Sequence, residues 1–458
     1  MTDICAHIFR AYDIRGIVGQ GIDAKTIQLI GHAIGSEALD KGQTTLLAGA
    51  DTRLSSPELS AALIKGILAS GCDVCDLGIV PTPLLYFATH VLPTGSGVML
   101  TGSHNPKDYN GIKIVIRKQA LADDQIQAIH HRIVDGQLHH GKGHYSQHDI
   151  GAAYIDRISS DIHLHKRFKV VLDCGNGVTG LFAPRLFTEL GCQVVPLYCT
   201  PDGNFPHHHP DPTRPENLLD LIAAVRQSGA DLGIAFDGDG DRVALITANG
   251  IIIDTDHLML AFIMDLLPEH PGASVVFDVK SSNSLEKIIR ANGGNPVMCK
   301  SGHSFVKQKV QETAALLGGE YSAHVFFQHR WYGFDDGMYV AARFLELMDR
   351  YHASAQHLLQ RMPQSVSTPE LFIPVLEEEK FPAMALIRDK LHFPDATFNY
   401  LDGIRVDFAE GWGLIRASNT TPNLVLRFEA NTQVALNEMK LQFQQHLLAL
   451  LPGLSLPI

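Results

Sequence analysis

One pattern recurs three times along the chain and restricts the folds that it can adopt. Each copy reads as an apolar strand, a polar turn, an amphipathic helix that ends at glycine, and a second apolar strand; the copies span residues 44–80, 168–199 and 273–302. Apolar strands that alternate with helices are typical of parallel sheets covered on both faces. The repetition predicts three related α/β domains, whose similarity is one of pattern and not of residue identity.

The last quarter of the chain has a different pattern. Four short apolar stretches between residues 364 and 430 predict the strands of a smaller mixed sheet, and residues 435–451 predict a closing amphipathic helix with apolar Leu436, Met439, Leu441 and Phe443. A chain of 458 residues has room for three or four domains. We expect an α/β protein with mixed, largely parallel sheets in domains 1–149, 150–251 and 252–364, followed by a smaller α+β domain at 365–458.

Composition and charge exclude several classes of protein. Hydrophobic residues make up 45% and charged residues 19%, as in ordinary folded soluble proteins. The formal net charge of -12 argues against nucleic acid as the main partner. No apolar run reaches the ~18 residues of a membrane span, so we expect no membrane partner. The seven cysteines are scattered and no secretory segment begins the chain, which predicts reduced thiols and a cytoplasmic protein.

Two motifs suggest other activities. Cys72 and Cys75 have the spacing of a redox motif, but they lie in an apolar stretch that reads as a buried strand, so we interpret them as core residues. GNGVTG at residues 175–180 follows an apolar strand and matches the dinucleotide-binding fingerprint, with Asp202 as the acidic residue downstream. The same turn also serves tight strand-to-helix packing, so an NAD-dependent dehydrogenase stays open as an alternative.

An acidic loop, AFDGDGDRVAL, predicts a metal site. Asp237, Asp239 and Asp241 alternate with glycines that let the chain curl, so that the three carboxylates can converge. Three such charges repel one another, and a hard divalent cation with oxygen ligands would neutralise them; Mg²⁺ suits a phosphate site. A calcium loop of the EF-hand type is excluded because Arg242 and Ala248 occupy its glycine and acidic positions.

A serine stands beside a histidine in the loop TGSHNPKDYNGIKI, residues 101–114. A hydrolase elbow would need glycine where Thr101 stands, and His104 is a poor base for Ser103 because neighbours on an extended chain point apart. A serine that carries a phosphoryl group fits better. Its proton carrier stays open among three candidates, which are Lys113, His303 and His324.

Two further loops offer groups for a sugar phosphate. Glu320, Ser322 and His324 alternate beside an apolar stretch and suit sugar hydroxyls, although an ordinary polar strand edge explains them equally well. A run of donors fits a phosphate cradle, with a simple hairpin turn as the alternative; it comprises Arg416, Ser418, Asn419, Thr420 and Thr421, followed by Arg427.

Taken in order, these motifs resemble one family. FRAYDIRG, GADTRLSSPEL, MLTGSHNPKDYNGIKI, FDGDGDR, GGEYSAH, GFDDG, RASNTTP and LRFEA run from residue 9 to residue 430 and are similar to motifs of the α-D-phosphohexomutase superfamily. Within it, the chain resembles the bacterial phosphomannomutase/phosphoglucomutase group. The resemblance implies a heart-shaped molecule whose four domains surround a central cleft.

The resemblance also implies roles for individual residues. Ser103 resembles the phosphoserine, which lends an oxygen to Mg²⁺ together with Asp237, Asp239 and Asp241. Arg15, Lys113 and Arg242, with the cleft histidines His303 and His324, resemble the catalytic residues. The implied substrate-binding set is Tyr12, Arg15, His104, Lys113, Lys280, Gly302, His303, Glu320, Ser322, His324, Arg416, Ser418, Asn419, Thr420, Thr421 and Arg427.

The implied reaction interconverts hexose 1-phosphate and hexose 6-phosphate, with glucose or mannose, through a 1,6-bisphosphate that also serves as activator. We expect a monomer whose partners are small sugar phosphates. Ala323, Tyr321 and His257 depart from residues common in the group. Two alternatives remain beside the dehydrogenase: a phosphoglucosamine mutase, whose branch typically reads S-A-S-H-N at the serine loop, and a non-catalytic sugar-phosphate-binding protein.

Overall fold

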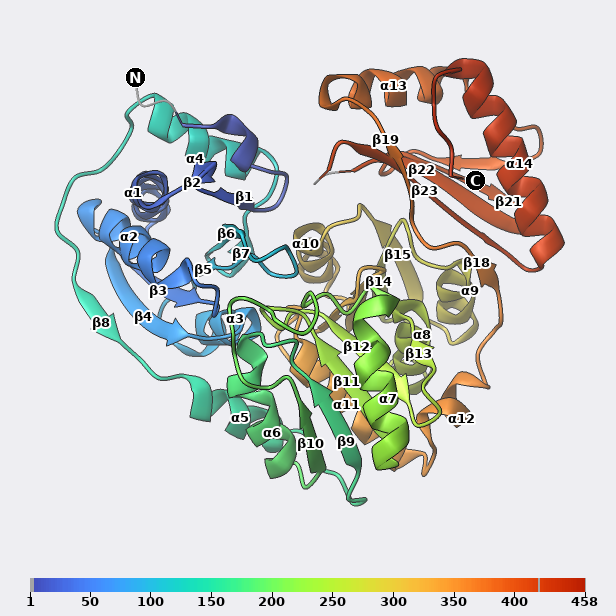
Figure 1. Cartoon of the computed structure of the whole chain (residues 1–458), viewed down its shortest axis with the longest axis horizontal. Helices are drawn as coiled ribbons and strands as arrows, with labels where there is room; N and C mark the ends of the chain where they lie inside the picture. The colour runs from blue at the N-terminus through green and yellow to red at the C-terminus, as the bar shows by residue number, and fades with distance from the viewer. Residues whose placement is uncertain (1–3, 419–420, 458) are drawn as a thin grey trace.

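The computed structural model describes residues 4–418 and 421–457. Asn419 and Thr420, which belong to the predicted phosphate cradle, lie outside these residues. Figure 1 shows three α/β regions that follow one another along the chain, and a C-terminal region in which helices cover one sheet. Within the described ranges, no helix is both long and apolar enough to cross a membrane.

The first region holds an eight-stranded sheet in the order β2-β1-β6-β5-β3-β4-β8, with β7 paired to β6. Helices α1, α2 and α4 pack together against the sheet (Figure 1). The elements are η1 (Ala6–Ile8), β1 (Ile14–Val18), β2 (Gly21–Ile22), α1 (Ala24–Asp40), β3 (Thr45–Ala50), α2 (Ser56–Ala69), β4 (Asp73–Ile79), α3 (Thr82–Val91), β5 (Gly97–Leu100), β6 (Tyr109–Ile116), β7 (Gln119–Ala120), α4 (Asp124–Val134) and β8 (Tyr145–Gln147).

The second and third regions hold sheets in the orders β10-β9-β11-β12-β13 and β15-β14-β16-β17. The second comprises α5 (Gly151–Ser159), β9 (Lys169–Asp173), η2 (Val178–Leu181), α6 (Ala183–Glu189), β10 (Gln193–Leu197), η3 (Pro215–Leu218), α7 (Leu219–Ser228), β11 (Leu232–Phe236), β12 (Val243–Thr247) and β13 (Ile252–Ile253). The third comprises α8 (Thr255–Leu266), β14 (Ser274–Asp278), α9 (Asn283–Ala291), β15 (Asn295–Cys299), α10 (His303–Thr313), β16 (Leu317–Glu320), β17 (His324–Phe327), α11 (Gly337–Arg350) and α12 (Ala355–Leu359).

All three sheets share one four-stranded core, which confirms the predicted relation between the domains. In each core the first strand pairs in parallel with the second and the third, and the third pairs antiparallel with the fourth. The cores run β3-β4-β5-β6, β9-β10-β11-β12 and β14-β15-β16-β17 in chain order. The loop after the third core strand therefore occupies the same place in every domain. These loops carry Ser103 after β5, Asp237 after β11 and Tyr321 after β16.

The C-terminal region is a six-stranded antiparallel sheet in the order β18-β23-β22-β21-β20, with β19 also paired to β23. Its elements are β18 (Val366–Ser367), β19 (Leu371–Pro374), α13 (Glu377–Lys390), β20 (Thr397–Asn399), β21 (Ile404–Phe408), β22 (Gly411–Ala417), β23 (Asn423–Ala430) and α14 (Gln433–Leu450). The predicted closing helix is α14, which buries Leu436, Met439 and Phe443. The prediction was wrong for Leu441, which is 53% exposed because it follows Met439 by two residues, about 200° around the helix.

Two different kinds of contact join the regions. One apolar cluster runs from the first region through the second into the third, where α11 packs against strands of both the second and third sheets. The C-terminal region has an apolar core of its own. Buried Arg405 stacks on Trp412 of the same region, 3.9 Å from the ring centre, and connects the region to the third one by donating to the carbonyl of Ser281 at 2.8 Å. The exact domain limits stay a prediction.

Candidate active site

A buried arginine fixes the loop of Ser103 by hydrogen bonds to its carbonyl groups. Arg53 donates through Nη2 to the carbonyls of Ser103 and Asn105, both at 2.7 Å, and its Nε lies 3.2 Å from a carboxylate oxygen of Asp51. A Cβ on Gly102 would lie 2.3 Å from Arg53 Nε, so only glycine admits the guanidinium beneath the loop. Ser103 itself has a φ of 47°, a left-handed conformation that this network of hydrogen bonds maintains.

The hydroxyl of Ser103 points toward the acidic loop. Ser103 Oγ donates to Asp237 Oδ2 at 2.8 Å and lies 3.2 Å from His104 Nδ1. A Cβ on Gly238 would lie 2.5 Å from the Ser103 carbonyl oxygen, so this glycine allows the two loops to touch. The serine of the first domain and the acidic loop of the second thus form one site.

The three acidic side chains converge in the interior as the sequence predicts. One oxygen from each of Asp237, Asp239 and Asp241 lies within 4.8 Å of the others, and all three residues are buried. Burial, followed by the charges of Asp239 and Asp241, raises the pKa of Asp237 well above its usual value. Burial also acts to raise the pKa of Asp239, but Lys113 outweighs it and leaves this pKa below its usual value.

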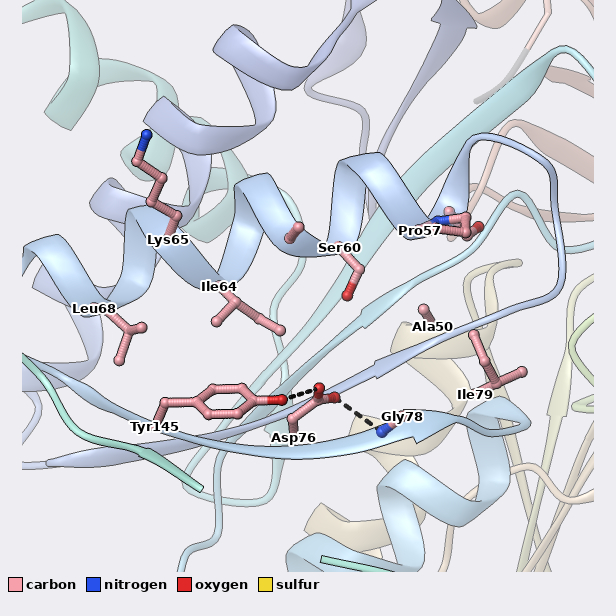
Figure 2. A pocket seen from close by; sticks show the side chains of 12 residues that line it. Ala50, Pro57, Ser60, Ile64, Lys65, Leu68, Asp76, Gly78, Ile79 and Tyr145 are labelled. Carbon is pink, nitrogen blue, oxygen red and sulfur yellow. Dashed lines mark hydrogen bonds between the residues drawn. The ribbon is translucent and has the colours of Figure 1, made fainter. Parts of the chain in front are cut away.

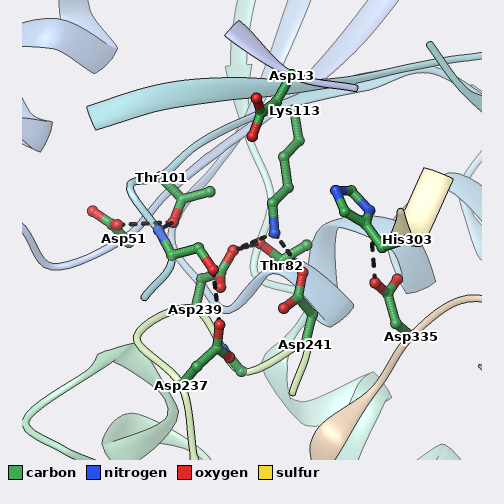
Figure 3. A network of polar contacts seen from close by, with 12 residues as sticks. Asp13, Asp51, Thr82, Thr101, Lys113, Asp237, Asp239, Asp241, His303 and Asp335 are labelled. Atoms are coloured by element: carbon green, nitrogen blue, oxygen red, sulfur yellow. Dashed lines mark hydrogen bonds and ion pairs between the residues drawn. The ribbon is translucent and has the colours of Figure 1, made fainter. Parts of the chain in front are cut away.

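Lys113 balances part of this charge. Its Nζ lies 2.7 Å from Asp239 Oδ2 and also pairs with Asp241 (Figure 3). Although burial opposes it, the two carboxylates raise the pKa of Lys113 well above its usual value, so the ammonium keeps its charge. The other oxygens, Asp239 Oδ1 and Asp241 Oδ1, are buried without a hydrogen-bond partner. Two orphaned carboxylate oxygens beside the Ser103–Asp237 pair fit a hard divalent cation.

A buried carboxylate that the sequence analysis did not single out organises the cleft histidines. Asp335 Oδ2 lies 3.0 Å from His324 Nδ1 and 3.8 Å from His303 Nδ1, and Figure 3 shows His303 above this carboxylate. Lys307 Nζ lies 2.8 Å from Asp335 Oδ1. The motif GFDDG at residues 333–337 was the available signal, although it gives no role to the first aspartate.

The two histidines differ in their surroundings. His324 Nε2 accepts a hydrogen bond from Arg242 Nε at 3.0 Å, so this ring is held between Arg242 and Asp335. Both ring nitrogens of His303 lack a hydrogen-bond partner. Burial, partly offset by Asp335 and reinforced by Lys113, lowers the pKa of His303 well below its usual value. His303 is therefore neutral and has free nitrogens.

The third and fourth regions contribute the residues that are predicted to bind the sugar and its phosphate. Glu320 accepts from Ser301 Oγ at 3.2 Å and lies 3.7 Å from Lys280 Nζ. Arg416 pairs with Asp402, 3.1 Å away. Thr421 Oγ1 donates to Ser418 Oγ at 2.9 Å.

Residues from all four regions line one cavity of about 1100 Å³. It brings together most of the predicted site: Tyr12, Arg15, Ser103, His104, Lys113, Arg242, Lys280, Gly302, His303, Glu320, Ser322, His324, Arg416, Ser418 and Thr421. It also includes a loop that the sequence analysis missed, with His209, Asp211 and Arg214, where prolines and histidines gave no functional signal.

Arg427, which belongs to the predicted substrate-binding set, lies behind the cavity wall. Its guanidinium stacks on the ring of Tyr321, 3.6 Å from the ring centre, and donates to the Lys280 carbonyl. Asp256 Oδ2 lies 3.4 Å from it. Arg427 therefore supports the positions of Tyr321 and Lys280 and does not face the cavity. The three aspartates of the acidic loop also lie behind the wall, beneath Ser103.

A second cavity lies outside this cleft, between α2 and β4 (Figure 2). Its volume is about 570 Å³, and its lining is mostly small and apolar, with Lys65 and Asp76 of opposite charge. Asp76 accepts a hydrogen bond from Tyr145 at 2.8 Å. This lining is unsuited to a doubly phosphorylated sugar, which needs several donors and cations.

Backbone atoms of the protein fill the space beside two glycines of GNGVTG. A Cβ on Gly177 would lie 2.8 Å from the carbonyl oxygen of Gly238, and one on Gly180 would lie 2.0 Å from that of Cys199. The motif opens a short 3₁₀ helix, η2, rather than a full α-helix whose end could hold a pyrophosphate. It packs against the acidic loop, which disfavours the dehydrogenase.

Comparisons with known proteins identify the family of the chain. Four phosphoglucomutase/phosphomannomutase domain families match the chain in order: alpha/beta/alpha domains I, II and III at residues 6–139, 152–250 and 254–366, and the C-terminal domain at 374–446. The phosphomannomutase/phosphoglucomutase of Pseudomonas aeruginosa is 52% identical over 452 residues, covering 99% of this chain and 98% of its own. The phosphoglucomutase of Neisseria meningitidis is 46% identical over 448 residues, 97% of each chain.

A solved structure gives the same result. The phosphoglucomutase/phosphomannomutase family protein of Burkholderia thailandensis superposes with a TM-score of 0.95 at 46% identity, over 100% of both chains. The chain therefore belongs to the phosphoglucomutase/phosphomannomutase family of the α-D-phosphohexomutase superfamily, whose members are isomerases.

Proposed function

We propose that this chain is a phosphohexomutase that interconverts the 1-phosphates and 6-phosphates of glucose and mannose. One observation carries the proposal. The Ser103 hydroxyl, 2.8 Å from Asp237, opens into a cavity of about 1100 Å³ that has cationic groups from different domains at separate places. A site that transfers a phosphoryl group between two ends of one sugar needs this arrangement, since one end reacts while the other is anchored.

The reaction begins with Ser103 in its phosphorylated form. The free hydroxyl of a bound hexose phosphate attacks the phosphorus, the bond to Ser103 Oγ breaks, and a hexose 1,6-bisphosphate forms. Arg15, Lys113 and Arg242 are the cations beside Ser103 in the cleft, and Lys113 keeps its charge because Asp239 and Asp241 stabilise it. These fixed charges offset the negative charge of the transferring phosphoryl group. The bisphosphate then turns over and returns its other phosphoryl group to Ser103.

The sugar hydroxyl that attacks the phosphorus loses its proton, so the cleft must supply a proton acceptor. We assign it to His303, because this ring is neutral, lines the cleft, and has both nitrogens free of hydrogen bonds. Tyr12 supports the ring, with the two ring centres 5.2 Å apart. His324 is held between Arg242 and Asp335, which suits it to orient these groups.

The sugar and its second phosphate bind on the opposite domains. Glu320 and Ser322 face the cavity and would hold two adjacent hydroxyls, leaving the 2-hydroxyl unread, so that glucose and mannose both fit. Arg416, Ser418 and Thr421 would anchor the phosphate that is not transferred. Because the C-terminal region has its own core, its rotation would close the cleft and release the product.

The acidic loop would hold Mg²⁺. Asp237, Asp239 and Asp241, with an oxygen on Ser103, would be its ligands, and the ion when bound would supply charge neutralisation at the phosphoserine. Without the ion, Asp239 Oδ1 and Asp241 Oδ1 are buried and have no hydrogen-bond partner. We also propose that a trace of glucose or mannose 1,6-bisphosphate maintains Ser103 in the phosphorylated form, and that the chain acts as a monomer.

A ³¹P NMR time course tests this function. The protein, Mg²⁺ and a trace of glucose 1,6-bisphosphate are mixed with glucose 1-phosphate, mannose 1-phosphate or glucosamine 1-phosphate. We expect conversion of the first two to the 6-phosphates and a near-complete loss with Ser103→Ala. Faster conversion of the glucosamine phosphate would identify a phosphoglucosamine mutase instead, and no conversion of any sugar by the wild type would refute the reaction class.

A further inference from the structure

Two cysteines that are distant in sequence meet behind the acidic loop. Cys174 follows β9 and Cys199 follows β10, and these strands are parallel neighbours in the second sheet (Figure 1). Their sulfur atoms are 3.4 Å apart, and both thiols are free. The spacing of 25 residues resembles no redox motif, so the pair is visible only in the fold.

The surroundings of the two sulfurs differ. Cys174 is fully buried, whereas Cys199 is only partly covered and can meet a small oxidant. The hydrogen bond between the sulfurs lowers the pKa of Cys199, while the same contact, followed by burial, raises the pKa of Cys174 well above its usual value. Cys199 thus has the character of the attacking thiolate and Cys174 that of the resolving thiol.

The short helix η2, which follows Cys174 in the chain, lies between Cys199 and the acidic loop. On one side, the Cys199 carbonyl presses on Gly180, where a Cβ would lie only 2.0 Å from the oxygen. On the other side, the Val178 amide donates to the Gly238 carbonyl at 3.2 Å. Thr179 also contacts this loop, because a Cβ on Gly240 would lie 2.3 Å from its methyl group. A displacement at the cysteines therefore reaches the loop that holds Asp237.

We propose that Cys174 and Cys199 form a reversible disulfide, a modification site that lowers turnover by displacing the acidic loop. The sulfurs need to approach by about 1.4 Å to reach the ~2.0 Å of a disulfide. In the reaction, the Cys199 thiolate attacks one oxygen of hydrogen peroxide, the O–O bond breaks, and a sulfenic acid and hydroxide form. The Cys174 thiol then attacks the sulfenic sulfur, the disulfide bond forms, and water leaves. The two thiols are oxidised and the peroxide is reduced.

Three buried cysteines of the chain do not compete in this way. Burial raises the pKa of Cys72 and of Cys192 to about 12, so these thiols stay protonated. Burial also raises the pKa of Cys299. Cys5 is exposed, lies in the first region, and provides a control for unspecific oxidation.

The test uses the full chain, reduced with dithiothreitol, desalted, and treated with hydrogen peroxide. We expect a Cys174–Cys199 linked peptide in non-reducing mass spectrometry. The activity should fall roughly tenfold, since displacements near 1 Å in a catalytic site cost this much or more. Dithiothreitol should restore it. Cys199→Ser and Cys174→Ala should keep their activity in peroxide, whereas Cys5→Ser should lose activity as the wild type does.

Three results would overturn the proposal. They are the absence of the linked peptide, full activity of the linked protein, and an equal loss of activity in Cys199→Ser and Cys174→Ala. The linked peptide is read by mass alone, so failure of the proposed mutase activity would be seen separately, in the reduced protein.

Discussion

Replacing Lys113 with methionine tests the electrostatics of the site in depth. Lys113 is 4% exposed, and its ammonium is 2.7 Å from Asp239 and paired with Asp241. Removal of one partner from a buried ion pair costs about 3–5 kcal/mol. Thr82 still donates to Asp239 Oδ2 at 2.5 Å, so we expect the lower end of this range, about 3 kcal/mol, in the free energy of unfolding.

The assay is urea unfolding followed by circular dichroism, with EDTA and then with excess Mg²⁺. Lys65→Met provides the matched control, because Lys65 is an exposed lysine of the same domain and its loss should cost less than about 0.5 kcal/mol. In Lys113→Met the acidic loop lacks its cation, so Mg²⁺ should stabilise this variant more than the wild type. A loss below about 1 kcal/mol in EDTA, or equal stabilisation of both proteins by Mg²⁺, would refute the reasoning.

Three further predictions follow from the same geometry. Thr82→Val removes the donor to Asp239, so the free energy of unfolding should fall by about 1–3 kcal/mol; urea unfolding measures this, and an unchanged value would count against the hydrogen bond. Gly238→Ala places a Cβ 2.5 Å from the Ser103 carbonyl, so kcat should fall roughly a hundredfold in the coupled mutase assay, and a full rate would contradict the close contact. Burial raises the pKa of Asp336 to about 7. Because its folded pKa exceeds the unfolded value of about 4, the folded state binds the proton more tightly and loses stability as the pH rises from about 4 to about 7. Asp336→Asn should therefore gain stability relative to wild type across that window, and parallel stability curves would refute this.

The fold and the site could be predicted from the sequence wherever the pattern or the chemistry lies within one continuous segment. The three repeats read as strand, turn, helix and strand, and the loops of Ser103 and Asp237 contain their own chemistry. The sequence did not show that equivalent loops of the three domains come together in space. The three loops meet because each follows the third strand of the same core, and this equivalence depends on the pairing of strands rather than on their residues.

The missed residues depend on contacts between distant segments. Asp335 was missed because its importance comes from His303 and His324, which reach it from other elements. The sequence analysis gave Arg53 no role of its own, yet it is buried under the Ser103 loop. Arg427 was grouped with the phosphate cradle because it is near in sequence, whereas β23 directs it behind Tyr321.

The central claim is that Ser103 carries the phosphoryl group between the two ends of the sugar. It is tested most directly by the mass of the intact protein and of its peptides. The protein is incubated with Mg²⁺ and glucose 1,6-bisphosphate, freed of sugar, and then chased with glucose 6-phosphate. We predict one phosphate on Ser103 before the chase, its loss during the chase, and the appearance of glucose 1,6-bisphosphate in equal amount. A phosphate that stays on Ser103 throughout the chase, or a Ser103→Ala variant that converts the sugars at the wild-type rate, would contradict the account.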